Sequence, residues 1–133
     1  MIGLGVLIQT LGGNAETVET VKSALGKTIN TVWIDDNTLY FKFTDGTNIK
    51  LSDEGQSCCE YRYMDTSDDL SEYEGSVLMD FELKPIKLES EDDSGEHEIQ
   101  FLDVKTDKGI FTVSNHNEHN GYYGGFWIVA KQF

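Results

Sequence analysis

The stretch INTVWIDDNTLYFKFTDGTNIKL, residues 29–51, carries the clearest structural signal in the chain. Three segments within it, 29–34, 39–43 and 48–51, alternate apolar and polar side chains, which is typical of half-buried strands. Asp35–Asn37 and Asp45–Gly46 supply the turn residues between these segments. The stretch therefore predicts an antiparallel meander of three strands.

Upstream of the meander, residues 14–25 have the apolar spacing of one amphipathic helix. Asn14 is a suitable N-cap and Gly26 can end the helix. The apolar segment Met1–Leu11 has neither a basic leader nor a small-residue cleavage site, so we interpret it as a buried segment and not as a signal peptide.

Downstream of the meander the patterns are weaker, because turn residues and acidic residues interrupt them. We expect an irregular segment at 52–64 and then a short acidic helix at 65–74, which Gly75 ends. A long strand at 77–88, bent by Pro85, and an acidic mobile loop at 89–96 should follow. The remaining expected elements are strands at 97–104 and 110–114, a turned loop at 114–126 and a last strand from Phe126.

These elements predict an α+β fold, in which an antiparallel sheet of about six or seven strands is combined with one N-terminal helix and one or two short helices. A chain of 133 residues is expected to form a single domain, 1–133. Within it, 1–26 is the N-terminal segment and helix, and 27–133 is the β-rich part that carries the motifs.

Two of the three histidines, His116 and His119, lie in the Asn- and Gly-rich stretch Ser114–Phe126. The two cysteines, Cys58 and Cys59, are adjacent and cannot form an ordinary disulfide with each other. Thiolate and imidazole are ligands that zinc prefers. If the fold brings the two stretches together, these four residues are the predicted ligands of a zinc ion; the alternative is that the cysteines simply pack in the core.

The net charge of -14 is concentrated between Ser52 and Glu98, where 16 acids stand against three bases. Such a segment repels nucleic acid and favours a basic partner surface, although acidic runs also occur simply as solvated loops. The predicted partner-binding residues lie on the short helix and the acidic loop: Asp65, Asp68, Asp69, Glu72, Glu74, Glu89, Glu91, Asp92 and Asp93.

Signatures of catalysis are weak in this chain. The sequence has no Gly-x-Ser-x-Gly elbow and no phosphate-binding loop, and the spacing of His116 and His119 is not that of the HExxH metalloproteases. We therefore expect no enzymatic activity. Two alternatives stay open: a small zinc-dependent enzyme, and a sponge for a nucleotide signal that uses the Tyr, Asn and His residues of the 114–126 loop.

The stretches 53–64 (DEGQSCCEYRYM) and 116–126 (HNEHNGYYGGF), with 95–109 between them, resemble the signature of a small-domain family of phage and prophage proteins that carries no assigned activity. The resemblance covers about residues 27–131 and places the cysteines and both loop histidines in its strongest motifs. It implies an accessory protein that blunts host defence in the bacterial cytoplasm, similar to zinc-containing anti-CRISPR proteins that bind Cas9 or its guide complex. Direct binding to nucleic acid or to a membrane is not expected.

Overall fold

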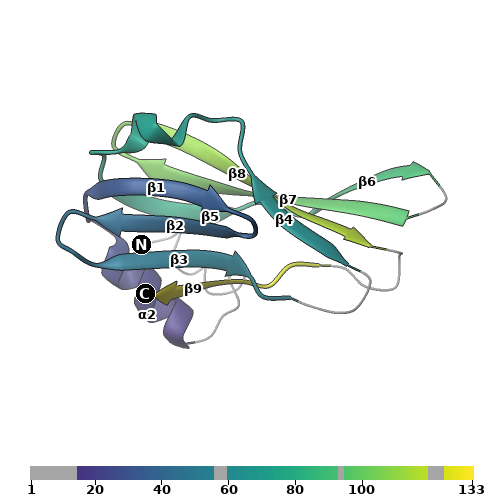
Figure 1. The fold of residues 1–133 in the computed structure, drawn as a ribbon, viewed down its shortest axis with the longest axis horizontal. Coiled ribbons are helices and arrows are strands. Elements are labelled where there is room, and N and C mark those ends of the chain that lie inside the picture. Colours follow the sequence, from purple (N-terminus) through teal and green to yellow (C-terminus); the bar gives the residue numbers. More distant parts are fainter. Residues whose placement is uncertain (1–14, 56–59, 93–94, 120–124) are drawn as a thin grey trace.

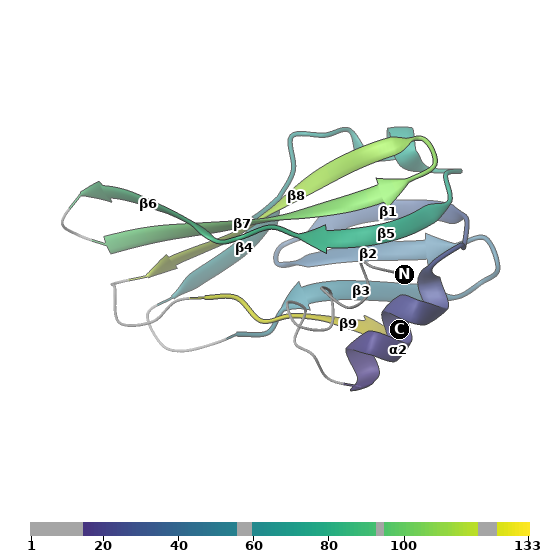
Figure 2. The same ribbon diagram turned by 180° about the vertical axis from the view of Figure 1, so that it is seen from behind.

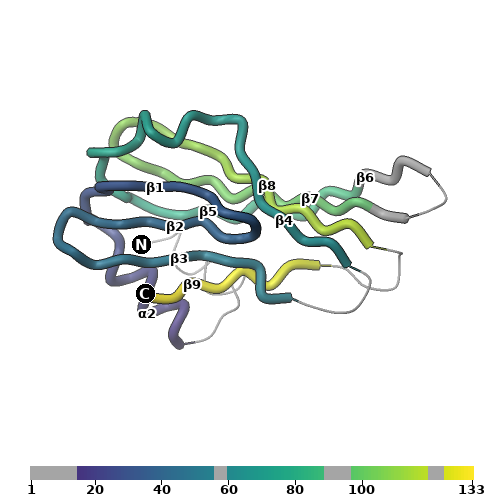
Figure 3. The backbone as a smooth tube through the Cα atoms, in the orientation of Figure 1, coloured from purple at the N-terminus to yellow at the C-terminus, as the bar shows by residue number. Residues whose placement is uncertain are grey.

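Nine strands in two antiparallel sheets, one α-helix and one 3-10 turn make up the part of the chain that the computed structural model describes, residues 15–55, 60–92, 95–119 and 125–133 (Figure 1). The first sheet has the strand order β1-β2-β3-β9. Its strands are β1 (Ile29–Asp35), β2 (Thr38–Phe43), β3 (Asn48–Asp53) and β9 (Ile128–Gln132). The predicted meander is confirmed, and Figure 3 shows the chain running back and forth through it.

The helix α2 (Ala15–Ala24) packs beside β9 at the edge of the first sheet, as the view from behind shows (Figure 2). Its buried face includes Thr17 and Val21, and the Thr17 hydroxyl accepts a hydrogen bond from the Ala130 amide at 3.2 Å. The prediction of a helix over 14–25 is thus confirmed for its described part. Within the described residues, no helix is long and apolar enough to cross a membrane.

The second sheet has the order β4-β8-β7-β5, and a further strand, β6, pairs with β7. Its strands are β4 (Tyr61–Asp65), β5 (Leu78–Leu83), β6 (Lys87–Asp92), β7 (Gly95–Thr106) and β8 (Gly109–His119). The short β5 and β6 pair with opposite halves of the long β7, with Pro85 in the connection between them. The predicted bend at Pro85 therefore divides one expected strand into two.

The hydrophobic core lies between the two sheets. Phe41 of the first sheet contacts Phe81 and Phe111 of the second, with ring centroids 5.9 and 6.5 Å apart, and all three side chains are fully buried. Burying an aromatic side chain of this size contributes on the order of 2–3 kcal/mol each. These contacts hold the sheets together near the β1–β2 hairpin, whereas the far ends of β7 and β6 extend past the first sheet (Figures 1 and 2).

The predicted α+β class with six or seven strands is wrong, because segments expected to be loops are strands. Residues 61–65, 89–92 and 115–119 are polar, and their polarity led to the prediction of irregular structure. They form strands because β7 and β8 offer long ladders of backbone hydrogen bonds, which satisfy the peptide groups whatever the side chains are.

Two predictions outside the sheets need comment. The acidic helix expected at 65–74 is only a 3-10 turn, Leu70–Tyr73, capped by the Asp69 side chain, which accepts from the Ser71 amide at 3.1 Å. Gly75 follows with φ +88, the left-handed conformation that suits the predicted stop. The N-terminal segment 1–14 lies outside the described residues.

Candidate functional site

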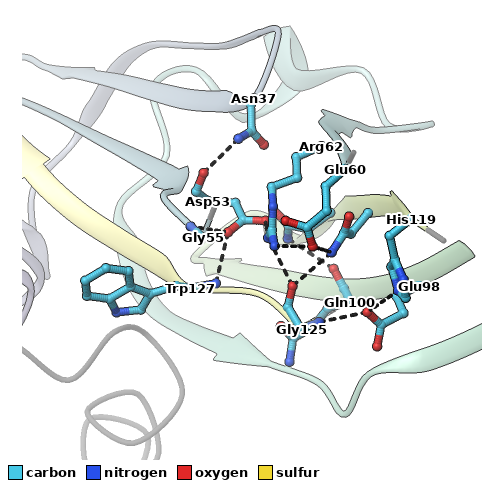
Figure 4. Close-up of polar contacts among 12 residues, drawn as sticks. Asn37, Asp53, Gly55, Glu60, Arg62, Glu98, Gln100, His119, Gly125 and Trp127 are labelled. Atoms are coloured by element: carbon cyan, nitrogen blue, oxygen red, sulfur yellow. Dashed lines mark hydrogen bonds and ion pairs between the residues drawn. The ribbon is translucent and has the colours of Figure 1, made fainter. Parts of the chain in front are cut away.

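A buried ion-pair cluster lies where β3, β4, β8 and the chain before β9 meet (Figure 4). Arg62 of β4 donates from Nη1 to Asp53 Oδ2 at 2.6 Å and from Nη2 to Glu60 Oε2 at 2.9 Å. The side chains are only 10, 1 and 2% exposed, respectively. A guanidinium is the cation that suits this position, because its planar fork can bind two carboxylates at once.

Arg62 and Asn117 connect this cluster to the chain before β9. Both donate to the Gly125 carbonyl oxygen, Arg62 at 3.0 Å and Asn117 at 3.3 Å, and Asn117 also donates to Glu60 Oε2 at 2.9 Å. Asn117 comes from the inward face of β8 and is fully buried. A neutral amide and a guanidinium thus satisfy one backbone carbonyl and one carboxylate together.

Asp53 holds the backbone on the other side of the cluster. Its Oδ1 accepts from the amides of Gly55 and Trp127, at 3.0 and 2.9 Å, while its own carbonyl accepts from Asn37 Nδ2 at 2.8 Å. Asp53 thus joins the end of β3 to the chain before β9 through hydrogen bonds from two backbone amides and an ion pair with Arg62.

A second acid, Glu98 of β7, completes the arrangement, which we call the buried polar network. Glu98 Oε1 accepts from the Gly125 amide at 2.7 Å and lies 2.9 Å from His119 Nε2. The His119 side chain is 3% exposed and that of Glu98 is 17% exposed. The network therefore binds both the amide and the carbonyl of Gly125, and fixes the point where the chain enters β9.

The network fastens the ends of two segments that are far apart in sequence. Gly55 and Glu60 flank residues 56–59, and His119 and Gly125 flank residues 120–124. Tyr61 lies opposite Glu118 in the β4–β8 ladder, so the two motif stretches emerge side by side. The fold thus brings together the flanks of the cysteine and histidine stretches, as the zinc hypothesis requires.

The two loop histidines do not share a site. Residues of β8 alternate between the sheet faces, and positions three apart point to opposite sides. His119 faces inward, next to Glu98, whereas His116 faces outward and contacts Asp65 and His97. One ion bound by both imidazoles does not fit this arrangement.

Cys58 and Cys59 lie outside the described residues. Among those that are described, no group of three or more His, Cys, Asp or Glu side chains is arranged to hold a metal ion. A zinc ion bound by the cysteines with a single loop histidine stays a prediction.

The structure describes the side chains of some, but not all, of the predicted partner-binding acids. Asp65, Asp68, Asp69 and Glu72 are exposed, and Glu74 is half-buried. Glu89, Glu91 and Asp92 belong to the part of β6 for which only the backbone is described, and Asp93 lies outside the described residues.

Sequence reasoning missed two further acids and one cation. Asp35 and Asp36, at the β1–β2 turn, have exposed side chains. The turn lies beside β4, since the Asp36 carbonyl accepts from the Met64 amide at 3.0 Å. We call the exposed acids of this region the acidic rim: Asp35, Asp36, Asp65, Asp68, Asp69 and Glu72. The central role of Arg62 was also missed. The composition could have indicated this role: Arg62 is the one arginine in residues 52–98, among 16 acids, and a cation in such a segment is expected to form ion pairs with carboxylates.

Neither a curated protein nor a solved structure matches the chain. A family model described as a domain of unknown function, DUF7448, matches residues 22–129. The match runs from α2 to β9 and includes every residue of the buried polar network. The chain therefore belongs to the DUF7448 family.

Proposed function

We propose that this protein acts by binding and not by catalysis, and that its acidic rim occupies a basic surface of a host nucleic-acid enzyme. The partner favoured by the resemblance to phage and prophage proteins is Cas9 or its guide complex, which makes the protein an anti-CRISPR inhibitor in the bacterial cytoplasm. Enzymes of this class present channels rich in Lys and Arg, which attract carboxylates as they attract phosphates.

The observation that carries the proposal is that, among the described residues, no lysine or arginine forms an ion pair with an acid of the rim. Every Lys and Arg of the chain lies in a described segment, yet none of their ion pairs there involves an acid between Asp65 and Glu74 or at the β1–β2 turn. Two other basic side chains make contacts there among the described residues: Lys108 Nζ donates to the Glu74 carbonyl oxygen, and His116 Nε2 lies 3.0 Å from Asp65 Oδ1.

Three acids outside the rim are paired with lysines. Asp45, Glu54 and Glu82 are each within 3.3 Å of a lysine Nζ, so their charge is offset locally. Carboxylates without a lysine or arginine partner keep their field available for a binding partner, which favours fast association that salt weakens.

The test is binding to the Cas9–guide complex, and inhibition of its cleavage, at low and at high salt. The rim variant combines Asp36→Asn, Asp68→Asn, Asp69→Asn and Glu72→Gln, which keep the hydrogen-bond acceptors used in the fold. The control combines Glu16→Gln, Glu19→Gln, Asp45→Asn and Glu54→Gln, which removes the same charge elsewhere.

We expect the rim variant to associate roughly tenfold more slowly or worse, since charges at an interface mainly set the association rate. The control should bind as the wild type does. Equal loss in both variants, or binding that neither variant nor salt changes, contradicts the acidic-rim mechanism. No binding to any Cas9 complex overturns the choice of partner.

Zinc is the second part of the proposal. We propose that Cys58 and Cys59 bind one zinc ion per chain. The role of this ion is to stabilise the fold and not to catalyse a reaction, because a zinc site closed by protein ligands leaves no position for an activated water. Elemental analysis of protein from zinc-replete growth should show bound zinc, and Cys58→Ser/Cys59→Ser should contain about one zinc per chain less. Metal-free wild-type protein contradicts this part.

A further inference from the structure

On the outer face of the second sheet, two imidazoles point directly at each other. His97 Nε2 of β7 and His116 Nδ1 of β8 are 2.8 Å apart, and the ring centroids are 5.1 Å apart. The two residues are diagonal neighbours in the ladder, because His97 is opposite Glu118 and His116 is opposite Ile99. This pair is separate from the buried polar network, which lies on the other face of the same sheet.

The orientation of His116 is fixed on two further sides. Its Nε2 lies 3.0 Å from Asp65 Oδ1, and its ring stacks on that of Tyr63 with centroids 4.4 Å apart and planes 5° from parallel. A carboxylate only accepts, so Nε2 carries the hydrogen and donates it to Asp65. The lone pair of a neutral His116 is then on Nδ1, facing His97.

A histidine that donates from one ring nitrogen to a carboxylate, and turns the lone pair of the other nitrogen toward an electron-pair acceptor, has the arrangement of a metal ligand. We propose that His97 Nε2 and His116 Nδ1 together bind a divalent transition metal ion of the kind that imidazole favours, such as zinc, nickel or copper, with water completing the coordination. The ion takes the place of the single hydrogen that the two nitrogens now share.

The geometric change required is small. Metal–nitrogen bonds of about 2.0–2.1 Å in a tetrahedral arrangement place two ligand nitrogens about 3.3 Å apart, so the rings must separate by about 0.5 Å. His116 is held by Asp65 and Tyr63, which leaves the movement to His97. Pre-orientation of one ligand lowers the entropy lost on binding.

The surroundings are electrostatically suitable for a cation. Glu118 lies opposite His97 in the ladder, and its Oε2 accepts from the Tyr63 hydroxyl at 2.7 Å. The Asp65 carboxylate is close on the other side, and the whole chain carries a charge of -14. Such a field raises the local concentration of cations and disfavours their release.

Affinity for zinc, measured by competition with a chromophoric chelator, tests the assignment. His97→Ala and His116→Ala should each weaken binding at this site by at least roughly tenfold. Asp65→Asn should weaken it by about tenfold, the lower end of what loss of a carboxylate behind a ligand histidine costs. Cys58→Ser/Cys59→Ser is the control that separates this site from the proposed cysteine site, and it should leave the site intact.

A second measurement uses the unmodified protein, so that it does not depend on how a variant folds. Paramagnetic copper(II), added in small amounts, should broaden the NMR signals of the His97 and His116 rings before those of His119, which lies on the opposite face. Equal broadening of all three rings, unchanged zinc affinity in His97→Ala, or loss of all zinc binding in the cysteine variant would overturn the assignment.

Discussion

Replacing Arg62 by methionine should be among the most destabilising single changes in this protein. Methionine keeps much of the apolar stem and removes the guanidinium, which leaves the carboxylates of Asp53 and Glu60 buried, at 1 and 2% exposure, without their cation. Removing one partner of a buried ion pair costs about 3–5 kcal/mol, because the remaining charge is desolvated and uncompensated. For a chain of this length that corresponds to a fall in melting temperature of roughly 10–20 °C.

Urea denaturation at pH 7 measures the free energy of unfolding directly. The matched control is Lys131→Met, which breaks the exposed pair with Glu54 and should cost less than about 1 kcal/mol. The double variant Arg62→Met/Asp53→Asn should lose less stability than the two single changes added together, because it removes one of the stranded charges. If Arg62→Met stays within about 1 kcal/mol of wild type, or the double change is simply additive, the buried network does not stabilise the fold as we reason.

Three further predictions concern stability. Hydrogen bonds from Lys105 and Lys84 lower the pKa of Glu82 from 4.5 to about 2, so the stabilisation that Glu82 gives the folded state is present above pH 4.5 and is lost as the pH falls towards 2. In Glu82→Gln, the free energy of unfolding should therefore change less between pH 4.5 and 2 than in the wild type. The same change with pH in both proteins contradicts this. Phe111→Ala should cost about 3–5 kcal/mol in urea denaturation, because a fully buried ring leaves a cavity between the sheets; a loss below 1 kcal/mol would show that the site collapses around the smaller side chain. Gly46→Ala should cost about 1–2 kcal/mol through its φ of +89 alone, since no atom lies within 4 Å of the added methyl group; a stability equal to wild type argues against that turn conformation.

Much of the first sheet could be predicted from the sequence, because local alternation and turn residues agree there. The meander of 29–51 needs only short-range pairing, and the helix before it shows its own spacing. The motif stretches could also be recognised as a candidate site, but whether they meet was left open; the bond from Arg62 to the Gly125 carbonyl, 63 residues away, shows that their flanks do. The same patterns gave the wrong fold class, because polar stretches were interpreted as loops.

The sequence by itself determined where alternation is strong, and it determined the surplus of acids in the middle of the chain. Only the tertiary structure decided which polar residues are buried. Asn117, Asp53 and Arg62 are polar and would be expected at the surface from the sequence alone. Their burial is possible because Arg62 pairs with Asp53, and because Arg62 and Asn117 both donate to the carbonyl of Gly125. The tertiary structure also decided which face of the sheet each histidine occupies. Pairing with β7 extends β8 as far as His119, and side chains alternate between the two faces along a strand. His116 therefore points outward to His97, and His119 points inward to Glu98.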